Sequence, residues 1–320
     1  DVSQILWSPK IKYSPFFGCE LPEIMHEEVI VPLDKRILII GDVHGCLSEL
    51  KNILKKMNYS SDTDYVFLIG DLINKGPNSI GVVRYAMENN FYAIRGNNED
   101  RVLGYVIKST IEPSYVFAKE AKYLKDMSTD MLSWINKLPY TIKIKRGIID
   151  PEGNKQEINN IREILLVHAG LLPGVSLEQQ DPYLMVKMRG ILCNDNGVLS
   201  GTDHKEASAW IDYWYGPEFV VFGHDSDRGL QKTDDAIGID TGCVYGKHLT
   251  GMIYNPITMD EINDNSDIES LEHEDIFEQK YSLLTVRSNF DCSYHSYCNA
   301  GNGNSRLFDE KTRKIRELMK

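Results

Sequence analysis

Six side chains of metal-binding type follow short apolar segments of the chain. They are Asp42, His44, Asp71, Asn97, His168 and His224. Carboxylate, imidazole and amide groups of this kind can hold two divalent cations about 3.5–4 Å apart, with one ligand shared between the ions. Each residue taken alone is more commonly a turn residue, a helix cap or a hydrogen-bonded core histidine. Their repeated position after apolar segments favours a metal site.

The apolar segments have the length and residue types of buried strands. We expect strands at 36–40, 65–69, 91–94, 164–167, 219–222 and 249–254, and helices at about 47–57 and 79–88. The alternation of strand and helix in the first part predicts a βαβαβ unit with a parallel sheet. Because ligands bind at the carboxyl ends of strands in such sheets, we expect the six residues to converge at one edge.

The chain divides by composition into three parts. Residues 1–35 contain four prolines among aromatic residues and predict an irregular arm on the surface. Residues 36–258 predict a catalytic domain, with a helical insertion at about 101–145 and an exposed loop at 146–160. Residues 259–320 predict an acidic linker and a C-terminal extension, because nine acidic residues and no Lys or Arg lie between positions 260 and 278. In this extension we expect a strand at 281–286 and a helix at 307–319.

The net charge of −12 argues against duplex nucleic acid as a partner, because an acidic surface repels polyanions. A small phosphate ligand remains compatible, since a local group of cations can dominate inside a cleft. No apolar segment approaches the length of a membrane helix, and no secretory signal is visible at the start of the sequence. Six dispersed cysteines without a CxxC pair predict reduced thiols and a cytoplasmic protein. The oligomeric state is left open.

Several motifs together resemble a known family. They are similar to the phosphoprotein-phosphatase branch of the calcineurin-like metallophosphoesterases. The segments that carry the similarity are Gly41-Asp-Val-His-Gly45, 70–77, Gly96-Asn97, 167–174, 185–189, 223–231 and 240–246. Within that branch the greatest similarity is to the symmetrical diadenosine tetraphosphate hydrolases and the ApaH-like phosphatases. The resemblance covers about residues 36–254.

The resemblance implies a fold, a metal centre and a reaction. The fold would be an α/β protein, an αββα sandwich of two mixed sheets flanked by helices. One ion would be held by Asp42, His44 and Asp71, and a second ion by Asp71 with three further ligands, namely Asn97, His168 and His224. Asp71 would bridge the ions, and a hydroxide shared between them would attack phosphorus. Manganese is the expected metal, with iron, zinc, magnesium and cobalt as alternatives.

The sequence departs from the family at the expected general acid. Asn98 occupies the position of the histidine that protonates the leaving group, and Asn74 occupies the position of the aspartate that orients this histidine. Because an amide cannot supply a proton at neutral pH, a leaving group that needs no proton is favoured. The predicted substrate is therefore a phosphoanhydride: a dinucleoside polyphosphate, a nucleotide-capped RNA end or polyphosphate. The alternative is that another side chain or a metal-bound water donates the proton.

Further side chains are candidates for contact with the substrate. The candidate catalytic residues are Asn98 and three positively charged side chains, namely Lys75, Arg189 and Arg228. The candidate substrate-binding residues are Arg95, Asn74 and Tyr245. Alternatives remain for three of these residues: Lys75 could pair with Glu99 or Asp100, Arg95 could brace its loop, and Tyr245 could be a core residue.

Two rival functions remain at this level. A Ser/Thr protein phosphatase would share the metal ligands and differ in its preferred leaving group. A metal-bearing but inactive binding module is conceivable because the acid position holds Asn98.

Overall fold

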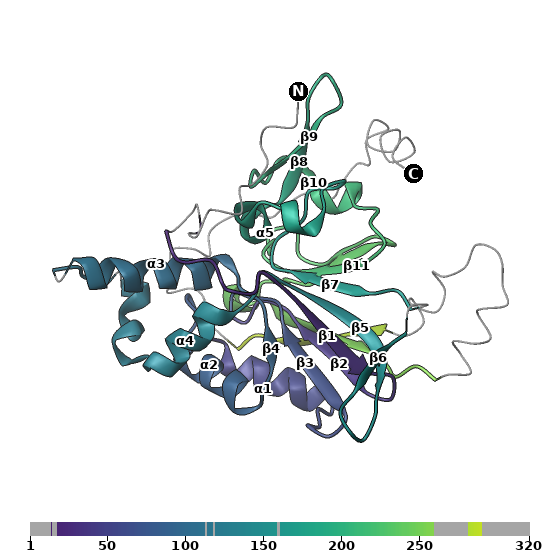
Figure 1. Cartoon of the computed structure of the whole chain (residues 1–320). Helices are drawn as coiled ribbons and strands as arrows, with labels where there is room; N and C mark the ends of the chain where they lie inside the picture. The colour runs from purple at the N-terminus through teal and green to yellow at the C-terminus, as the bar shows by residue number, and fades with distance from the viewer. Residues whose placement is uncertain are drawn as a thin grey trace.

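Two β-sheets lie face to face in the computed structural model, and helices cover their outer faces (Figure 1). The structure describes residues 14, 18–112, 114–117, 119–158, 161–258 and 281–289. The arrangement of these residues is the predicted αββα sandwich.

The first sheet contains the predicted βαβαβ unit. Its strand order is β15-β14-β2-β3-β4, with β2 (Arg36–Ile40), β3 (Asp64–Leu68) and β4 (Tyr92–Ala93) parallel to one another. Helix α1 (Leu47–Lys56) connects β2 to β3, and α2 (Ser79–Glu88) connects β3 to β4. β14 (His248–Tyr254) and β15 (Tyr281–Arg287) extend the sheet antiparallel. The strands predicted at 249–254 and 281–286 are thereby confirmed.

The second sheet combines distant parts of the sequence. Its strands run in the order β1-β5-β7-β11-β13-β12, and β6 pairs with β5. Their bounds are β1 His26–Pro32, β5 Thr141–Ile149, β6 Lys155–Glu157, β7 Ile164–Val167, β11 Phe219–Phe222, β12 Gln231–Lys232 and β13 Ala236–Gly238. A small third sheet has β8 (Gly190–Cys193) between β9 (Leu199–Thr202) and β10 (Ser208–Ala209).

The remaining helices flank these sheets. The helical insertion lies between β4 and β5 in the sequence. It consists of α3 (Asn97–Ile111), the 3-10 helix η2 (Lys119–Asp126) and α4 (Thr129–Lys137). On the outer side of the second sheet lie η3 (Leu177–Gln179), α5 (Pro182–Lys187) and η4 (Trp210–Tyr213). A last turn, η5 (Cys243–Tyr245), precedes β14.

Alternating side chains along the strands explain the layers. In β2, Ile37 and Ile39 join the core between the two sheets, whereas Leu38 and Ile40 join the core under the helices. Side chains of a strand point alternately to opposite faces, so a strand that is apolar throughout is covered on both sides. Leu166 of β7 contributes to the same inter-sheet core and is fully buried.

The prediction of an irregular N-terminal arm is wrong for residues 26–32. This segment is β1, which pairs in parallel with β5 from His26 opposite Thr141 to Pro32 opposite Gly147. Val31 is fully buried in the inter-sheet core. The segment is short, and its partner strand lies more than a hundred residues away, so local pattern alone did not indicate its place.

The predicted limits of the helical insertion also need correction. The insertion ends at Lys137, and residues 141–149 form β5 rather than the end of a helix. The predicted exposed loop at 146–160 contains the end of β5 and its hairpin partner β6. Pairing of β5 with β1 and β7 on either side selects the strand. The predicted helix at 307–319 and the acidic segment 259–280 lie outside the described residues.

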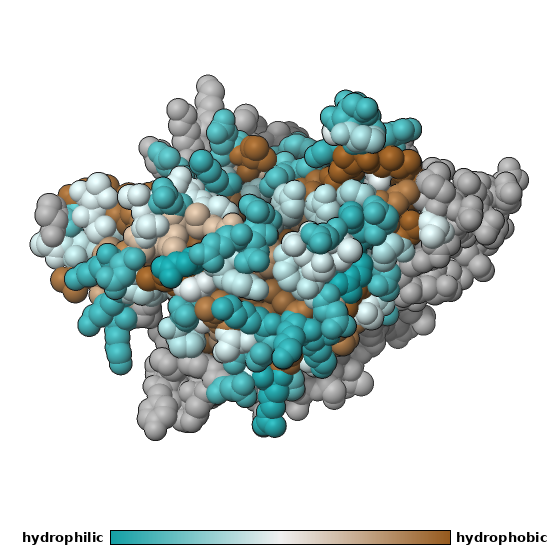
Figure 2. Space-filling view, turned by 90° about the horizontal axis from the view of Figure 1, so that it is seen from below, coloured by the Kyte–Doolittle hydropathy of each residue, from teal (hydrophilic) through white to brown (hydrophobic). Residues whose placement is uncertain are grey.

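The outer face below the first sheet is predominantly hydrophilic, with apolar patches between the polar side chains (Figure 2). Helix α1 illustrates this, because Lys51 and Lys55 are exposed while Leu50, Ile53 and Leu54 are buried. No helix among the described residues is long and apolar enough to cross a membrane.

Leu166→Ala is expected to lower the free energy of unfolding by about 2–5 kcal/mol, because it opens a cavity between the sheets. Leu230 is 52% exposed, and Leu230→Ala serves as the control with a change within about 0.5 kcal/mol. Urea denaturation measures both values. Equal losses in the two variants would contradict the inter-sheet position of Leu166.

Candidate metal centre

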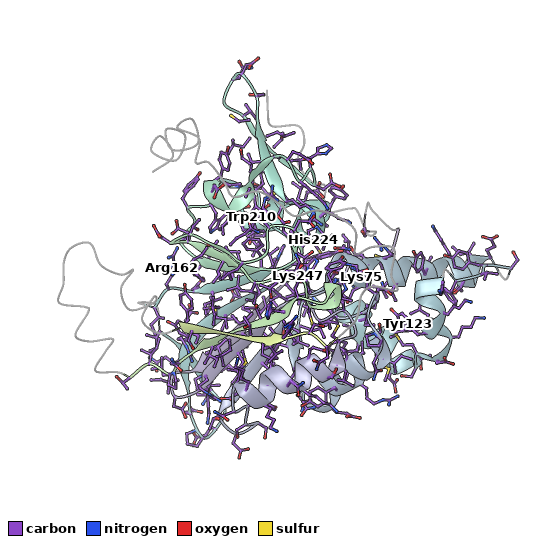
Figure 3. The ribbon with its side chains drawn as sticks, turned by 180° about the vertical axis from the view of Figure 1, so that it is seen from behind. Lys75, Tyr123, Arg162, Trp210, His224 and Lys247 are labelled. Carbon is purple, nitrogen blue, oxygen red and sulfur yellow. The ribbon has the colours of Figure 1, made fainter. Side chains whose placement is uncertain are left out.

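The carboxyl ends of strands from both sheets meet at one edge and bring the predicted ligands together. Ligand atoms of Asp42, His44 and Asp71 lie within 4.8 Å of one another, and so do those of Asp71, His168 and His224. All five side chains are at most 7% exposed. Asp71 belongs to both groups, as a bridging ligand would. Figure 3 shows His224 and Lys75 in the middle of the molecule, between the two sheets and the insertion.

The backbone is strained where several of these residues lie. His44, Asp71 and His224 have φ of 45°, 49° and 65°, in the left-handed region that residues other than glycine rarely adopt. Such strain persists only where the surrounding contacts hold it, and it is concentrated at functional sites. Gly223 permits the close approach, because a Cβ there would overlap Asp42 Oδ1.

His44 and Asp71 face each other with acceptor atoms. His44 Nδ1 lies 3.1 Å from the Ile73 carbonyl oxygen, which can only accept, so Nδ1 carries the proton. His44 Nε2 then presents a lone pair toward Asp71 Oδ2 at 3.3 Å. Asp42 is held by the backbone N–H of His224, which is 3.2 Å from each of its carboxylate oxygens.

The other group shows the same pattern. His168 Nδ1 donates to the Ile69 carbonyl oxygen at 2.9 Å, so Nε2 again presents a lone pair. That lone pair faces Asn97 Oδ1 at 3.3 Å and Asp71 Oδ1 at 3.4 Å. His224 Nε2 is buried and has no hydrogen-bond partner among the residues that the structure describes. The sequence prediction placed Asn97 here, and the structure brings it to His168.

These residues fit a pair of divalent cations. Acceptor atoms that converge at hydrogen-bonding distance, together with an orphaned imidazole nitrogen, need positive charge between them. Burial lowers the pKa of His44 to about 3, with a further contribution from Lys75, and burial also lowers the pKa values of His168 and His224. The imidazoles are therefore neutral at physiological pH, which is the form that binds metals.

The carboxylates are crowded in the same space. Burial raises the pKa of Asp42 well above its ordinary value, and the nearby Asp240 and Asp71 raise it further. For Asp71, burial acts upward, but nearby positive charge outweighs it and lowers the pKa; because the imidazoles are neutral, Lys75 is the neighbour that carries this charge. The charge of Asp71 is thus maintained inside the protein by its neighbours.

The model of the calcineurin-like phosphoesterase family matches residues 35–228, which include all the candidate ligands. The chain belongs to this family.

Relatives and solved structures extend the similarity. The chain is 28% identical over 160 residues to the symmetrical bis(5'-nucleosyl)-tetraphosphatase of Buchnera aphidicola, which covers 49% of this chain and 51% of that protein. It is 24% identical over 229 residues to the asymmetrical bis(5'-nucleosyl)-tetraphosphatase of Oceanobacillus iheyensis, with 67% and 87% covered. A crystal structure of a protein provisionally assigned as a diadenosine tetraphosphatase is 27% identical, with a TM-score of 0.62, over 83% of this chain and 98% of that one. The chain thus spans about half the length of the first relative and most of the other two.

At the acid position of the calcineurin-like family, Asn98 is turned toward a metal-ligand candidate. Its backbone N–H donates to Asp71 Oδ1 at 2.8 Å, and its side-chain Nδ2 donates to Asp71 Oδ2 at 2.6 Å. Asn74 Nδ2 donates in turn to Asn98 Oδ1 at 3.1 Å. Both side chains are at most 3% exposed, so the structure does not place Asn74 as a substrate contact. The two amides are bonded to each other, and Asn98 alone of the two is bonded to Asp71.

Lys75 points into the candidate centre. Its Nζ lies 3.0 Å from His44 Nε2 and 5.3 Å from the centre of the Tyr245 ring. The proposed pairing with Glu99 or Asp100 is not found. Glu99 accepts hydrogen bonds from backbone N–H groups of the site loops, and Asp100 bonds to Tyr140 and Arg95. Tyr245 is accordingly a neighbour of the centre.

Arg95 is a brace, and its prediction as a substrate contact is not supported. Its side chain is fully buried. It donates to the Glu20 carbonyl at 2.9 Å, to the Asn136 carbonyl at 2.5 Å and to Asp100 Oδ1 at 3.2 Å. These bonds join the N-terminal segment, the end of α4 and the start of α3. The bracing alternative is the one that the structure favours, because no exposed surface remains for a phosphate.

Arg228 and Arg189 differ in how fully they are engaged. Arg228 pairs with Asp225 and donates to the carbonyls of Lys205 and Ala207 at 2.6 and 2.7 Å. It therefore ties the His224 loop to the small third sheet. Within the described residues, the Arg189 side chain donates through Nη1, which lies 3.3 Å from the His224 carbonyl and 3.4 Å from Asp225 Oδ1. Arg189 is the better candidate for a phosphate contact.

Two charged residues near the centre escaped prediction as site residues. Asp240 is buried, and burial raises its pKa to about 6. It follows a strand as the other candidates do, so the same signal was available. The pKa of Lys187 is lowered by burial and then by Arg101, while Asp71 acts in the opposite direction. Lys187 ends α5, and only the tertiary arrangement turns it toward the site.

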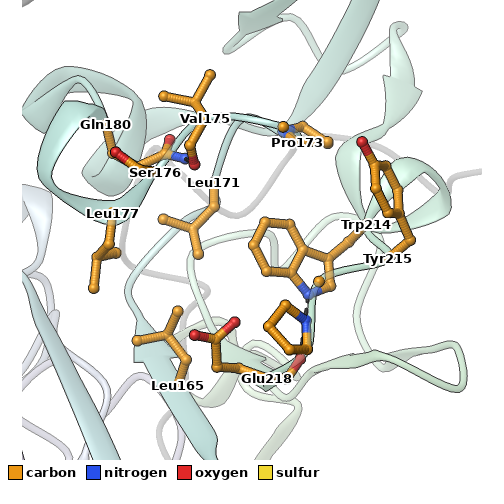
Figure 4. Close-up of a pocket in the computed structure, with 13 residues that line it drawn as sticks. Leu165, Leu171, Pro173, Val175, Ser176, Leu177, Gln180, Trp214, Tyr215 and Glu218 are labelled. Atoms are coloured by element: carbon orange, nitrogen blue, oxygen red, sulfur yellow. Dashed lines mark hydrogen bonds between the residues drawn. The ribbon is translucent and has the colours of Figure 1, made fainter. Parts of the chain in front are cut away.

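A cavity of about 380 Å³ lies apart from the candidate ligands (Figure 4). Leu165, Leu171, Trp214 and Pro217 form part of its mostly apolar lining. Glu218 also lines it and pairs with Lys143 at 2.9 Å. None of the six candidate ligands contributes to this lining, so the cavity and the metal centre are separate features.

Arg228→Met is expected to lower the free energy of unfolding by about 1–3 kcal/mol, because it leaves the buried Asp225 with a weaker partner. Arg189→Met is expected to change stability less and to reduce turnover more. Urea denaturation and steady-state kinetics on the same preparations separate the two effects. A full loss of turnover with unchanged stability in Arg228→Met would contradict the assignment of this residue as a brace.

Proposed function

We propose that this member of the calcineurin-like family is a two-metal phosphohydrolase that cleaves phosphoanhydride bonds. The substrate class is dinucleoside polyphosphates such as diadenosine tetraphosphate, or the related nucleotide-capped ends and polyphosphate. Support comes from two kinds of relative, one named as a symmetrical and the other as an asymmetrical bis(5'-nucleosyl)-tetraphosphatase. Support also comes from the two overlapping groups of candidate ligands.

One observation carries the choice of substrate class. The acid position holds the amide of Asn98, and its N–H groups are directed at Asp71. The oxygen of a serine or threonine side chain is a poor leaving group unless it is protonated. A nucleotide phosphate is a weak base and leaves without a proton. The site therefore suits a phosphoanhydride better than a phosphoprotein.

The residues of the chain would share the work as follows. Two cations, when bound, supply a low-pKa water and neutralise phosphate charge. Asp71 would hold both cations, with Asp42 and His44 on one side and with Asn97, His168 and His224 on the other. Lys75, Arg189 and Lys187 surround the centre with positive charge, which would orient the phosphate chain and stabilise charge that develops during transfer.

Manganese is the cation we propose to test first, because it accepts mixed carboxylate, amide and imidazole ligands. We also propose a cytoplasmic location, because reduced thiols are typical of cytoplasmic proteins. Among the described residues, Cys19, Cys46, Cys193 and Cys243 are free thiols.

Diadenosine tetraphosphate is expected to be turned over faster than a phosphoserine peptide in the presence of Mn²⁺. Asp71→Asn is expected to lower turnover more than about 100-fold, because it weakens the ligand shared by the two ions. Phosphate and nucleotide release measure both. Faster turnover of the phosphopeptide would favour a protein phosphatase, and inertness toward both substrates, polyphosphate and capped RNA would favour a binding module.

The double variant Asn74→Asp/Asn98→His is expected to restore a general acid with its orienting carboxylate. Its turnover of phenyl phosphate relative to para-nitrophenyl phosphate should rise by about tenfold or more, because only the poorer leaving group needs the proton. Asn98→His alone is the control. An unchanged ratio in the double variant would speak against Asn98 as the reason for leaving-group preference.

A further inference from the structure

A chain of three hydrogen bonds links the helical insertion to the candidate bridging carboxylate. The Tyr123 hydroxyl donates to Asn74 Oδ1 at 2.6 Å. Asn74 Nδ2 donates to Asn98 Oδ1 at 3.1 Å, and Asn98 Nδ2 donates to Asp71 Oδ2 at 2.6 Å. Tyr123 belongs to η2, and Figure 3 shows it on the side of the insertion, beyond Lys75.

The direction of this chain is fixed at its inner end. The ionised carboxylate of Asp71 can only accept, so Asn98 must present its NH₂ group to it. The oxygen of Asn98 then faces Asn74, which must present its own NH₂ group. The oxygen of Asn74 therefore faces Tyr123, and the phenol must donate. The orientation of the Asn98 amide is thus fixed by Asp71, and the orientation of the Asn74 amide is fixed by Asn98.

We propose that Tyr123 is a positioning residue for the metal centre. Its hydroxyl anchors both amides in the orientation that Asp71 fixes, so that Asn98 donates to Asp71 Oδ2 and the remaining lone pairs of Asp71 stay available for the two ions. This inference rests on the proposed two-metal function. It gives the helical insertion a role in holding the bridging ligand, where the family resemblance assigned it none.

The insertion holds Tyr123 firmly enough for this role. Ala121 and Leu124, its neighbours on η2, are 0% and 5% exposed and belong to the core under the helices. Ser79 also bonds to the Tyr123 side chain and accepts from the Asn74 backbone N–H at 3.0 Å. Burial raises the pKa of Tyr123, so the phenol remains a donor at neutral pH.

Tyr123→Phe tests the proposal because it removes the hydroxyl and keeps the ring. Binding of Mn²⁺ by the purified full chain is measured by titration calorimetry, without substrate. Loss of an outer partner of a metal ligand typically costs 10–100-fold in affinity, so we expect at least about a tenfold weaker affinity in this variant. Tyr115→Phe makes the same chemical change elsewhere on the insertion, where the ring contacts Tyr105 and Phe117, and should stay within about twofold of the unaltered chain.

A double-variant cycle separates positioning from a general effect on packing. Asn98→Leu removes the donor through which Tyr123 would act. If the chain is the route, Tyr123→Phe should weaken Mn²⁺ binding much less in the Asn98→Leu background than in the unaltered protein. Equal losses in the two backgrounds would overturn the proposal, and so would unchanged Mn²⁺ affinity in Tyr123→Phe.

Circular dichroism and thermal unfolding of the metal-free variants show whether each one folds. A lower melting temperature with unchanged Mn²⁺ affinity would identify Tyr123 as a packing residue only and overturn the inference. Failure of the unaltered chain to bind Mn²⁺ would overturn it as well. Because the titration needs no substrate, it can succeed even where hydrolysis of diadenosine tetraphosphate is not found, so the inference and the proposed substrate class fail separately.

Discussion

The site depends on keeping one negative charge, that of Asp71, inside the protein. A buried carboxylate is costly unless donors or cations surround it. Asn98 supplies two N–H groups, and neutral His44 and His168 turn their lone pairs toward the same space. Glu99 fixes the strained backbone beside it by accepting from the N–H groups of Asp71 and its neighbour at 2.9 Å. This crowding of acceptors is what makes divalent cations the fitting occupants.

The same constraint explains the departure from the family at the acid position. A histidine that donates its proton to a leaving group must be free to change its charge. The amide of Asn98 has no such freedom, but it supplies a fixed dipole that holds Asp71 in one orientation. In the proposed two-metal site, a proton donor is thus exchanged for a donor that holds the candidate bridging ligand. Under the proposed function, that exchange suits substrates whose leaving group is already a weak base.

Two of the arginines near the motifs, Arg95 and Arg228, hold the loops that carry the candidate ligands. Arg95 joins the N-terminal segment to the end of α4, and Arg228 fastens the His224 loop to the third sheet. A planar guanidinium with five donors can satisfy several carbonyls at once, which suits it to this work. Proximity to a motif in the sequence therefore did not distinguish an arginine that contacts phosphate from one that fixes the loop. Only the partners of each nitrogen decide that.

The sequence by itself determined the strands that end in candidate ligands, because apolar segments followed by Gly, Asp, His or Asn are local signals. It placed β2, β3, β7 and β11 and the residues after them, from Asp42 to His224, at one edge. Pairing between distant strands decided the rest: β1 joined β5 across more than a hundred residues, which local periodicity does not record. The tertiary structure alone brought Tyr123 to Asn74 and turned Arg95 away from the site. Side-chain direction depends on which surface each element packs against, and that surface is formed only when the two sheets come together.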